Sequence, residues 1–216
     1  MARELRRRGL WVGLYAVAMA AVEAAVVVYL RALHPGPAPV SVLLDEIPNH
    51  LVAIEAGREA ATLVMLLAVA TLAGRTRWER FLYFSLAFGV WDIFYYFWLR
   101  VFIGWPPSLL TWDVLFLLPV PWLAPVLAPV IVSVGLVAGS WWLLARHRRL
   151  PGSAWALAGT AAALVLLSFI LDYRLALARV EPTTFRWWLF GGGVGLGGIA
   201  LWRAVRMGSV ENGGAR

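Results

Sequence analysis

The feature that most constrains this chain is its division into apolar blocks, each about twenty residues long, separated by short segments rich in arginine or proline. An α-helix rises about 1.5 Å per residue, so a block of roughly twenty residues crosses a hydrocarbon layer about 30 Å thick. Hydrophobic residues make up 62% of the chain and charged residues 14%, which lies outside the range of soluble domains. The sequence therefore predicts an all-α, polytopic membrane helix bundle.

The blocks predict six transmembrane helices within a single transmembrane domain of residues 1–216. The expected spans lie at about 9–33, 48–73, 81–103, 122–145, 154–175 and 187–205. The arginine-rich start and Ala18-Met-Ala20 also suit a signal peptide and its cleavage site. The first apolar run continues to about Leu33, however, which is too long for a signal peptide and favours a first span. A proline-rich loop is expected from His34 to Val40, and a short interfacial helix from Ser41 to Ile47.

The arginine clusters predict the orientation of the bundle. They lie before the first span, between the second and third, between the fourth and fifth, and after the sixth. With six spans, all four positions fall on the same side of the membrane. The positive-inside rule then predicts that both termini lie in the cytoplasm. Because the arginines follow this topological pattern, the formal net charge of +7 does not call for a nucleic-acid partner.

The segment from Val114 to Leu144 stays apolar for longer than one span needs. It is interrupted by Pro119, Pro121, Pro125 and Pro129. We expect a short half-helix or re-entrant segment first, and then the fourth span from about Trp122. The last three prolines would share one helical face and free carbonyls that must be buried in protein or line a polar cavity, so this segment is predicted to be mobile or site-lining. Asp113, just before it, is expected in a first helical turn, where a negative charge suits the helix dipole.

Charged residues inside the second expected span provide the candidate site. Glu55, Arg58, Glu59 and Thr62 fall at i, i+3, i+4 and i+7, so a helix places them in one polar stripe. Carboxylates of the first and third spans come at similar depths, in the outer half of the bilayer. Ionisable residues at membrane depth are costly and usually face the interior of a bundle. We therefore expect one ligand- or ion-binding site, formed by Glu23, Glu55, Arg58, Glu59 and Asp92.

Two chemical functions fit such a site. Carboxylates crowded in a low dielectric hold protons near neutral pH, which suits transport or proton-coupled binding of a small ligand, the leading hypothesis. The alternative is an oxidoreductase with a divalent metal ion, similar to di-iron carboxylate bundles. Its candidate ligands are Glu23, His50, Glu55, Glu59 and Asp92. Against this alternative, His50 lies about 140° around the helix from Glu55, and the Glu-x-x-His pairing of such bundles is absent.

A purely structural interpretation is also open. Arg58 would then neutralise one carboxylate, and Asp92 would accept hydrogen bonds from Trp or Tyr donors. A third function, a structural or accessory subunit, follows from the glycine-rich sixth span. Residues 193–198 match the dinucleotide pattern G-x-G-x-x-G, but no strand precedes them. The small residues four apart, Gly191 with Gly195 and Gly193 with Gly197, instead favour close helix contact, within a homo-oligomer or with a partner membrane subunit.

Residue types that are missing exclude some chemistries. The chain has no cysteine, which excludes disulfides, thiolate metal sites and cysteine nucleophiles. Every cationic side chain apart from histidine is arginine, so a Schiff-base lysine, and with it retinal or pyridoxal phosphate chemistry, is excluded.

Residues 104–122 read GWPPSLLTWDVLFLLPVPW. This stretch resembles one in a group of uncharacterised bacterial integral membrane proteins, which share a GWP element followed by SLLTWDxLFLxPxPW. The resemblance covers mainly the third and fourth spans. It implies a multi-pass location in a bacterial inner membrane, and it implies no particular activity.

Overall fold

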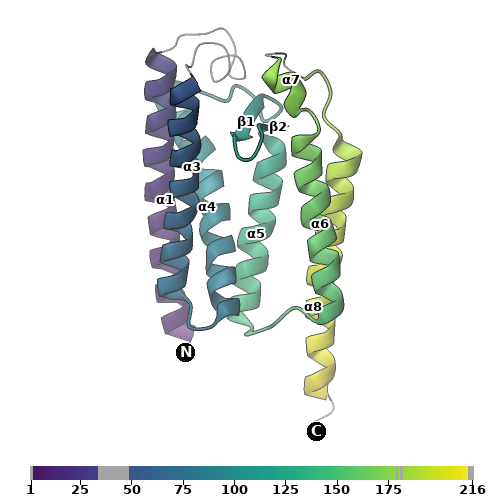
Figure 1. Ribbon diagram of the computed structural model, residues 1–216. Coiled ribbons are helices and arrows are strands. Elements are labelled where there is room, and N and C mark those ends of the chain that lie inside the picture. The colour runs from purple at the N-terminus through teal and green to yellow at the C-terminus, as the bar shows by residue number, and fades with distance from the viewer. Residues whose placement is uncertain (1, 34–48, 179, 181, 214–216) are drawn as a thin grey trace.

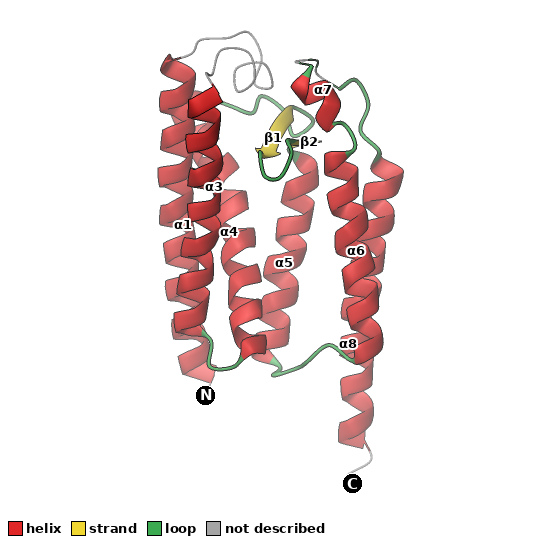
Figure 2. Cartoon of the chain, in the orientation of Figure 1, coloured by secondary structure: helices red, strands yellow, loops and turns green. Residues whose placement is uncertain are grey.

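The computed structural model of the chain describes residues 2–33, 49–178, 180 and 182–213 (Figure 1). It is mostly helical, with a short two-stranded sheet near one end (Figure 2). The expected loop at His34 and the expected helix at Ser41 lie outside the described residues. In chain order the elements are α1 (Ala2–Leu33), α3 (Asn49–Ala73), α4 (Arg77–Ile103), β1 (Trp112–Phe116), β2 (Trp122–Pro125), α5 (Leu127–Ala145), α6 (Gly152–Ile170), α7 (Tyr173–Leu177) and α8 (Trp187–Gly213).

Among the described residues, five helices are long and apolar enough to cross a membrane. They are α1, α4, α5, α6 extended by α7, and α8. This is the helix content of a multi-pass membrane protein. α3 is not one of the five; it is 25 residues long, carries Glu55, Arg58 and Glu59 in its first half, and lies against α1 and α4. Each predicted span overlaps one long helix, but the bounds differ. α1 already begins at Ala2, the fourth predicted span also takes in β2, the fifth runs from α6 into α7, and α8 continues to Gly213.

The long helices alternate in direction along the chain (Figure 1). The start of α1, the turn between α3 and α4, the loop between α5 and α6, and the end of α8 therefore lie at one end of the molecule, at the bottom of Figure 1. These are the places where the sequence holds its arginine clusters. The clusters thus gather at one end, which is the arrangement that the positive-inside rule addresses.

Local signals fix both ends of α4. Thr76 precedes the helix in an extended conformation, and its hydroxyl oxygen accepts a hydrogen bond from the Glu79 N–H at 3.1 Å, which satisfies a donor of the first turn. The helix ends at Gly104, whose φ of 69° lies in the left-handed region that glycine adopts without steric cost. α4 contacts α1, α3 and α5, so its position organises the helices around the candidate site.

Small residues let these helices approach closely. Ala16 and Ala20 of α1 are fully buried in the same core as Ala87 of α4. A Cβ atom added at Gly89 of α4 would lie 2.7 Å from the carbonyl oxygen of Ser133 in α5, so only glycine fits there. Close contact of this kind holds membrane helices together by van der Waals packing, because lipid provides no hydrophobic drive between them.

The glycine-rich helix α8 packs on α6. A Cβ added at Gly193 would lie 2.9 Å from the Val165 side chain and 3.0 Å from the carbonyl oxygen of Ala161. The close helix contact predicted for these glycines is therefore made within the chain at Gly193. At Gly191 and Gly195, no described atom of another element lies within 4 Å of such a Cβ. Contact of that second face with another copy or with a partner subunit stays a prediction.

The segment before α5 differs from the prediction. β1 pairs with β2 in antiparallel register, with Trp112 opposite Pro125 and Asp113 opposite Ala124. The expected half-helix is therefore wrong, and so is the expected start of the fourth span at Trp122, because α5 begins at Leu127. Asp113 correspondingly lies in a strand and not in a first helical turn.

The proline pattern explains this difference. Proline restricts the residue before it to extended conformations, and Pro119, Pro121 and Pro125 follow one another closely. The aromatic and β-branched residues of β1 also favour a strand. Pro121 lies outside any helix and Pro125 ends β2, so the predicted common helical face of the prolines does not exist.

Candidate functional site

One face of α3 carries the polar stripe that the sequence predicts. Glu55, Glu59 and Thr62 are buried, with exposed fractions of 8%, 7% and 1%. Spacings of four and three residues place their side chains one above another on the same helical face. α3 lies against α1 and α4 (Figure 1). The burial of these side chains shows that this face points into the protein and not toward the surroundings.

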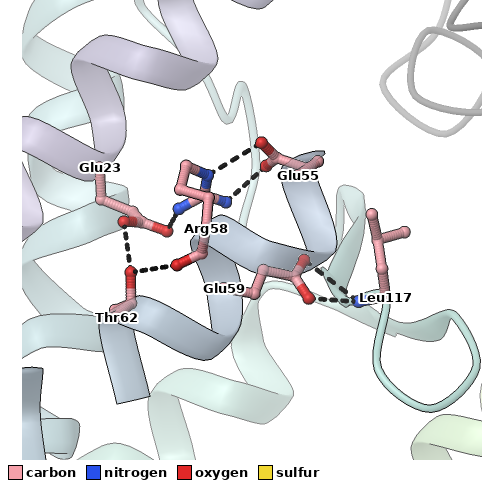
Figure 3. A network of polar contacts seen from close by, with 6 residues as sticks. All are labelled: Glu23, Glu55, Arg58, Glu59, Thr62 and Leu117. Carbon is pink, nitrogen blue, oxygen red and sulfur yellow. Dashed lines mark hydrogen bonds and ion pairs between the residues drawn. The ribbon is translucent and has the colours of Figure 1, made fainter. Parts of the chain in front are cut away.

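Arg58 joins α3 to α1. Its Nε donates a hydrogen bond to Glu55 at 2.9 Å, a second guanidinium nitrogen contacts the other oxygen of the same carboxylate, and a third forms an ion pair with Glu23 of α1 (Figure 3). The Thr62 hydroxyl donates to Glu23 at 3.1 Å. A planar guanidinium presents N–H donors along several edges, so one arginine can bind two carboxylates at the same time.

Glu59 binds the loop that follows β1. The backbone N–H of Leu117 donates to both oxygens of the Glu59 carboxylate, at 2.9 and 3.1 Å (Figure 3). A buried backbone donor needs an acceptor, and a charged acceptor forms a stronger hydrogen bond than a neutral one. This contact therefore ties the β1–β2 hairpin to α3.

Two aspartates have partners of their own. Asp92 of α4 accepts a hydrogen bond from the Ser133 hydroxyl of α5 at 2.8 Å. Asp113 of β1 accepts one from the Tyr96 hydroxyl of α4 at 3.1 Å. The expected Trp or Tyr donor for Asp92 is therefore wrong, because a serine on the neighbouring helix provides the hydrogen bond. A serine hydroxyl is short enough to reach a carboxylate where two helices pack closely.

All five predicted site residues line one small cavity between α1, α3, α4 and the hairpin, with a volume of about 40 Å³. We call it the acidic cavity. Its predicted members are Glu23, Glu55, Arg58, Glu59 and Asp92. Its further lining includes Arg31, Trp91, Tyr95, Tyr96, Asp113 and residues 114–117 of the hairpin. The carboxylates thus meet at one cavity, although Glu59 and Asp92 do not share their hydrogen-bond partners with the Arg58 pair.

Sequence reasoning missed two charged members of the acidic cavity. Arg31 lies in the last turn of α1, eight residues after Glu23 and hence near the same helical face, which is a signal that could have revealed it. Its guanidinium lies over the Trp105 ring, 4.2 Å from the ring centroid, as in a cation–π contact. Asp113 carried no such signal, since its position depends on the hairpin.

Trp91 adds an unpaired donor to the cavity wall. Its side chain is 5% exposed, and its indole N–H has no hydrogen-bond partner in the described part of the chain. A buried donor without an acceptor costs roughly 1–3 kcal/mol. The arrangement therefore favours an oxygen ligand or a water molecule beside the ring.

The metal alternative requires several His, Asp or Glu side chains close together. Among the described side chains, no three His, Asp or Glu residues come close enough together to hold a metal ion. His50 lies in the first turn of α3, but its side chain is outside the described part of the structure. The carboxylates instead use Arg58, Ser133 and the Leu117 N–H as partners.

These features define a multi-pass helical membrane protein whose buried carboxylates converge on one internal cavity. Comparisons with protein-family models, with proteins of curated function and with solved structures give no match to this chain. Its function therefore has to be inferred from the geometry of the cavity itself.

Proposed function

We propose that this chain is a six-span protein of the bacterial inner membrane that transports protons or a small cation, or couples their binding to that of another ligand, through the acidic cavity. In this proposal α3 crosses the membrane in addition to the five apolar helices, both termini lie in the cytoplasm, and the cavity lies in the outer half of the bilayer. Glu55, Glu59 and Asp92 bind the ion or proton, and Arg58 is their counter-charge.

The charge balance of the cavity carries the proposal. Five carboxyl groups line it, against the two guanidinium groups of Arg31 and Arg58. A buried charge without a partner costs several kcal/mol, and a carboxyl group avoids this cost by holding a proton or by binding a cation. Since the carboxyl groups outnumber the arginines, some of them take one of these two forms.

The size of the cavity limits what it binds. One water molecule needs roughly 10–15 Å³ of such volume, so about 40 Å³ holds a few waters or one small ion. Pockets for metabolites commonly measure about 300–1,000 Å³. In this conformation the cavity therefore suits a proton together with a few water molecules. No three described carboxylates are close enough to hold one cation, so a cation or a larger ligand would require the cavity lining to move.

The hydrogen bond between Leu117 and Glu59 offers a way to couple these events. An ionised carboxylate accepts a stronger hydrogen bond than a protonated one. When a proton binds to Glu59, the hydrogen bond that its carboxyl group accepts from the Leu117 N–H weakens. Proton uptake by Glu59 would then loosen the β1–β2 hairpin, which closes the cavity. In this way a local change of charge would move a neighbouring element.

Proteoliposomes that contain the purified chain and an internal pH-sensitive dye test this proposal. An imposed pH gradient should drive proton flux through the wild-type protein. Glu59→Gln should lower the initial rate at least roughly tenfold, because the amide cannot take up a proton although it still accepts from the Leu117 N–H. The matched control is Asp172→Asn, since this buried carboxylate pairs with Arg186 at 2.6 Å and does not line the cavity. It should keep the wild-type rate.

Sodium and potassium gradients, read with the matching dyes, form the second half of the experiment. Flux of one of these cations that falls in Glu59→Gln would identify the cavity as a cation path. No flux above protein-free liposomes for protons, sodium or potassium would contradict the proposal. The same conclusion follows if Glu59→Gln and Asp172→Asn behave identically.

A further inference from the structure

A second and larger pocket lies at the opposite end of the bundle from the hairpin. It has a volume of about 530 Å³ and is bounded by the start of α1, the turn between α3 and α4, and the end of α5. This volume lies within the usual range of sites for small ligands, about 300–1,000 Å³. We call it the basic pocket, because four arginines line it: Arg8, Arg75, Arg148 and Arg149.

The two glutamates of the basic pocket are already engaged. Glu4 forms ion pairs with Arg7 at 3.0 Å and with Arg8 at 2.9 Å. Glu79 accepts a hydrogen bond from the backbone N–H of Arg75 at 2.8 Å. The exposed side chains of Arg75 and Arg149, in contrast, make no hydrogen bond or ion pair with any described residue. Two guanidinium groups are thus available for an anion.

The backbone that carries Arg148 and Arg149 is held in place. α5 ends with His147 in the left-handed region, at a φ of 50°. The N–H of His147 donates to the Leu144 carbonyl at 3.2 Å and that of Arg148 to the Leu143 carbonyl at 3.0 Å, the two hydrogen bonds of a Schellman motif. The Trp78 indole N–H also donates to the Arg148 carbonyl oxygen at 2.8 Å. These hydrogen bonds fix the backbone from which the side chains of Arg148 and Arg149 extend at the rim of the pocket.

Beneath this charged rim the pocket is apolar. Leu82, Leu143 and Leu144 are buried and form part of its floor, together with the ring of Tyr83. A charged rim above an apolar floor suits a molecule with an anionic head and an apolar body. The pocket lies at the end of the bundle where the arginine clusters gather, which is where basic side chains meet anionic lipid headgroups.

We propose that the basic pocket binds a phosphate-bearing anion, with the phosphate between Arg75 and Arg149. Arginine presents paired donors that match phosphate oxygens, and each basic side chain near an anionic surface strengthens binding roughly fivefold. The apolar floor favours an anionic phospholipid over free phosphate as the source of this group. Binding of an anion in the basic pocket does not depend on the function of the acidic cavity.

Native mass spectrometry of the full chain in detergent tests this proposal. The probes are short-chain phosphatidylglycerol, phosphatidylcholine and inorganic phosphate. Arg75→Gln/Arg149→Gln should weaken binding of phosphatidylglycerol about 25-fold, because two basic contacts are lost. The matched control is Arg3→Gln/Arg6→Gln, which removes the same charge from exposed positions at the same end of α1 but outside the pocket. The control should bind as the wild type does.

The two sources of the phosphate give different results. Stronger binding of phosphatidylglycerol than of inorganic phosphate identifies a lipid site, and equal binding of both identifies a phosphate site of the same chemistry. Equal weakening in both double variants would overturn the proposal, because it would show nonspecific attraction to a basic surface. Binding of phosphatidylcholine as tight as that of phosphatidylglycerol would overturn it too, and so would binding of neither lipid nor phosphate. Unchanged thermal unfolding of the variants checks that they are folded.

Discussion

At the scale of single residues, Arg58 is the side chain on which the acidic cavity depends most. Its guanidinium contacts both Glu23 and Glu55, which are buried. Arg58→Met would leave these two carboxylates without their counter-charge. We expect a loss of about 3–5 kcal/mol of stability, since removing one partner strands a buried charge. For a chain of this length that corresponds to a fall in Tm of at least roughly 6 °C in detergent.

Two further variants separate charge from packing. Arg186→Met removes the partner of Asp172, but the Arg186 side chain is 37% exposed and water screens this pair. Because Asp172 is itself buried, the loss of its partner should still lower stability by about 1–3 kcal/mol, which is less than in Arg58→Met, where two carboxylates lose their partner. Adding Glu23→Gln and Glu55→Gln to Arg58→Met should recover most of the lost stability. If the triple variant is as unstable as Arg58→Met, the role of Arg58 is packing and the charge argument fails.

The residue scale also shows what periodicity reveals. Glu55, Arg58, Glu59 and Thr62 were predicted to share a face because helical geometry alone fixes that relation. The depths of Glu23 and Asp92 followed from the rise per residue, and the structure brings both to the same cavity. The hydrogen-bond partners of these carboxylates could not be predicted from periodicity or from depth. The Leu117 N–H lies 58 residues from Glu59, and the Ser133 hydroxyl 41 residues from Asp92, so both contacts depend on how separate elements pack.

At the scale of elements, the contact between α6 and α8 depends on Gly193. A Cβ there would lie 2.9 Å from the Val165 side chain and 3.1 Å from the Val165 backbone nitrogen, and backbone cannot yield as a side chain does. Gly193→Ala should therefore lower stability by about 1–3 kcal/mol, the usual cost of overpacking. Thermal unfolding of the purified full chain measures this change.

The matched control lies two residues away. An added Cβ at Gly195 has no described atom of another element within 4 Å, and alanine stabilises a helix relative to glycine by up to about 1 kcal/mol. Gly195→Ala should thus be neutral or slightly stabilising. If both substitutions destabilise equally, α8 does not pack on α6 through Gly193 as described. A smaller assembly in Gly195→Ala alone would support a contact between copies through that face.

Elements were predicted with uneven success, and the reason is physical. Long apolar blocks predict helices well because a membrane requires every backbone group to be satisfied within its own segment. The hairpin of β1 and β2 has no such signal. Its residues are as apolar as those of a span, and only the closely spaced Pro119 and Pro121 argued against a helix. Strand pairing between residues 112 and 125 is set by the surrounding helices, which a local pattern does not contain.

At the scale of the whole molecule, the arginine clusters predict which end faces the cytoplasm. The chain contains no cysteine, so single reporter cysteines are uniquely labelled. Ser108→Cys lies after α4 and Ser153→Cys at the start of α6, and both positions are exposed. A membrane-impermeant maleimide added to intact bacterial spheroplasts should label Ser108→Cys and leave Ser153→Cys unlabelled until the membrane is opened. The reverse pattern would contradict the predicted orientation.

Whether α3 crosses the membrane decides between five and six spans, and two further reporters answer that question. Arg3→Cys lies near the start of α1 and Arg77→Cys at the start of α4, and both positions are exposed. If α1 and α3 both cross, the two reporters lie on the same side, and neither is labelled in intact spheroplasts. If α1 crosses and α3 does not, Arg77→Cys lies on the opposite side from Arg3→Cys and is labelled. The stripe of Glu55, Arg58 and Glu59 makes α3 the costliest span to insert. Its two carboxylates are buried, however, and the half-buried Arg58 pairs with Glu23 of α1. Protection of Arg77→Cys is therefore the expected result, and its labelling would place the acidic cavity outside the membrane and remove the basis of the proposed transport.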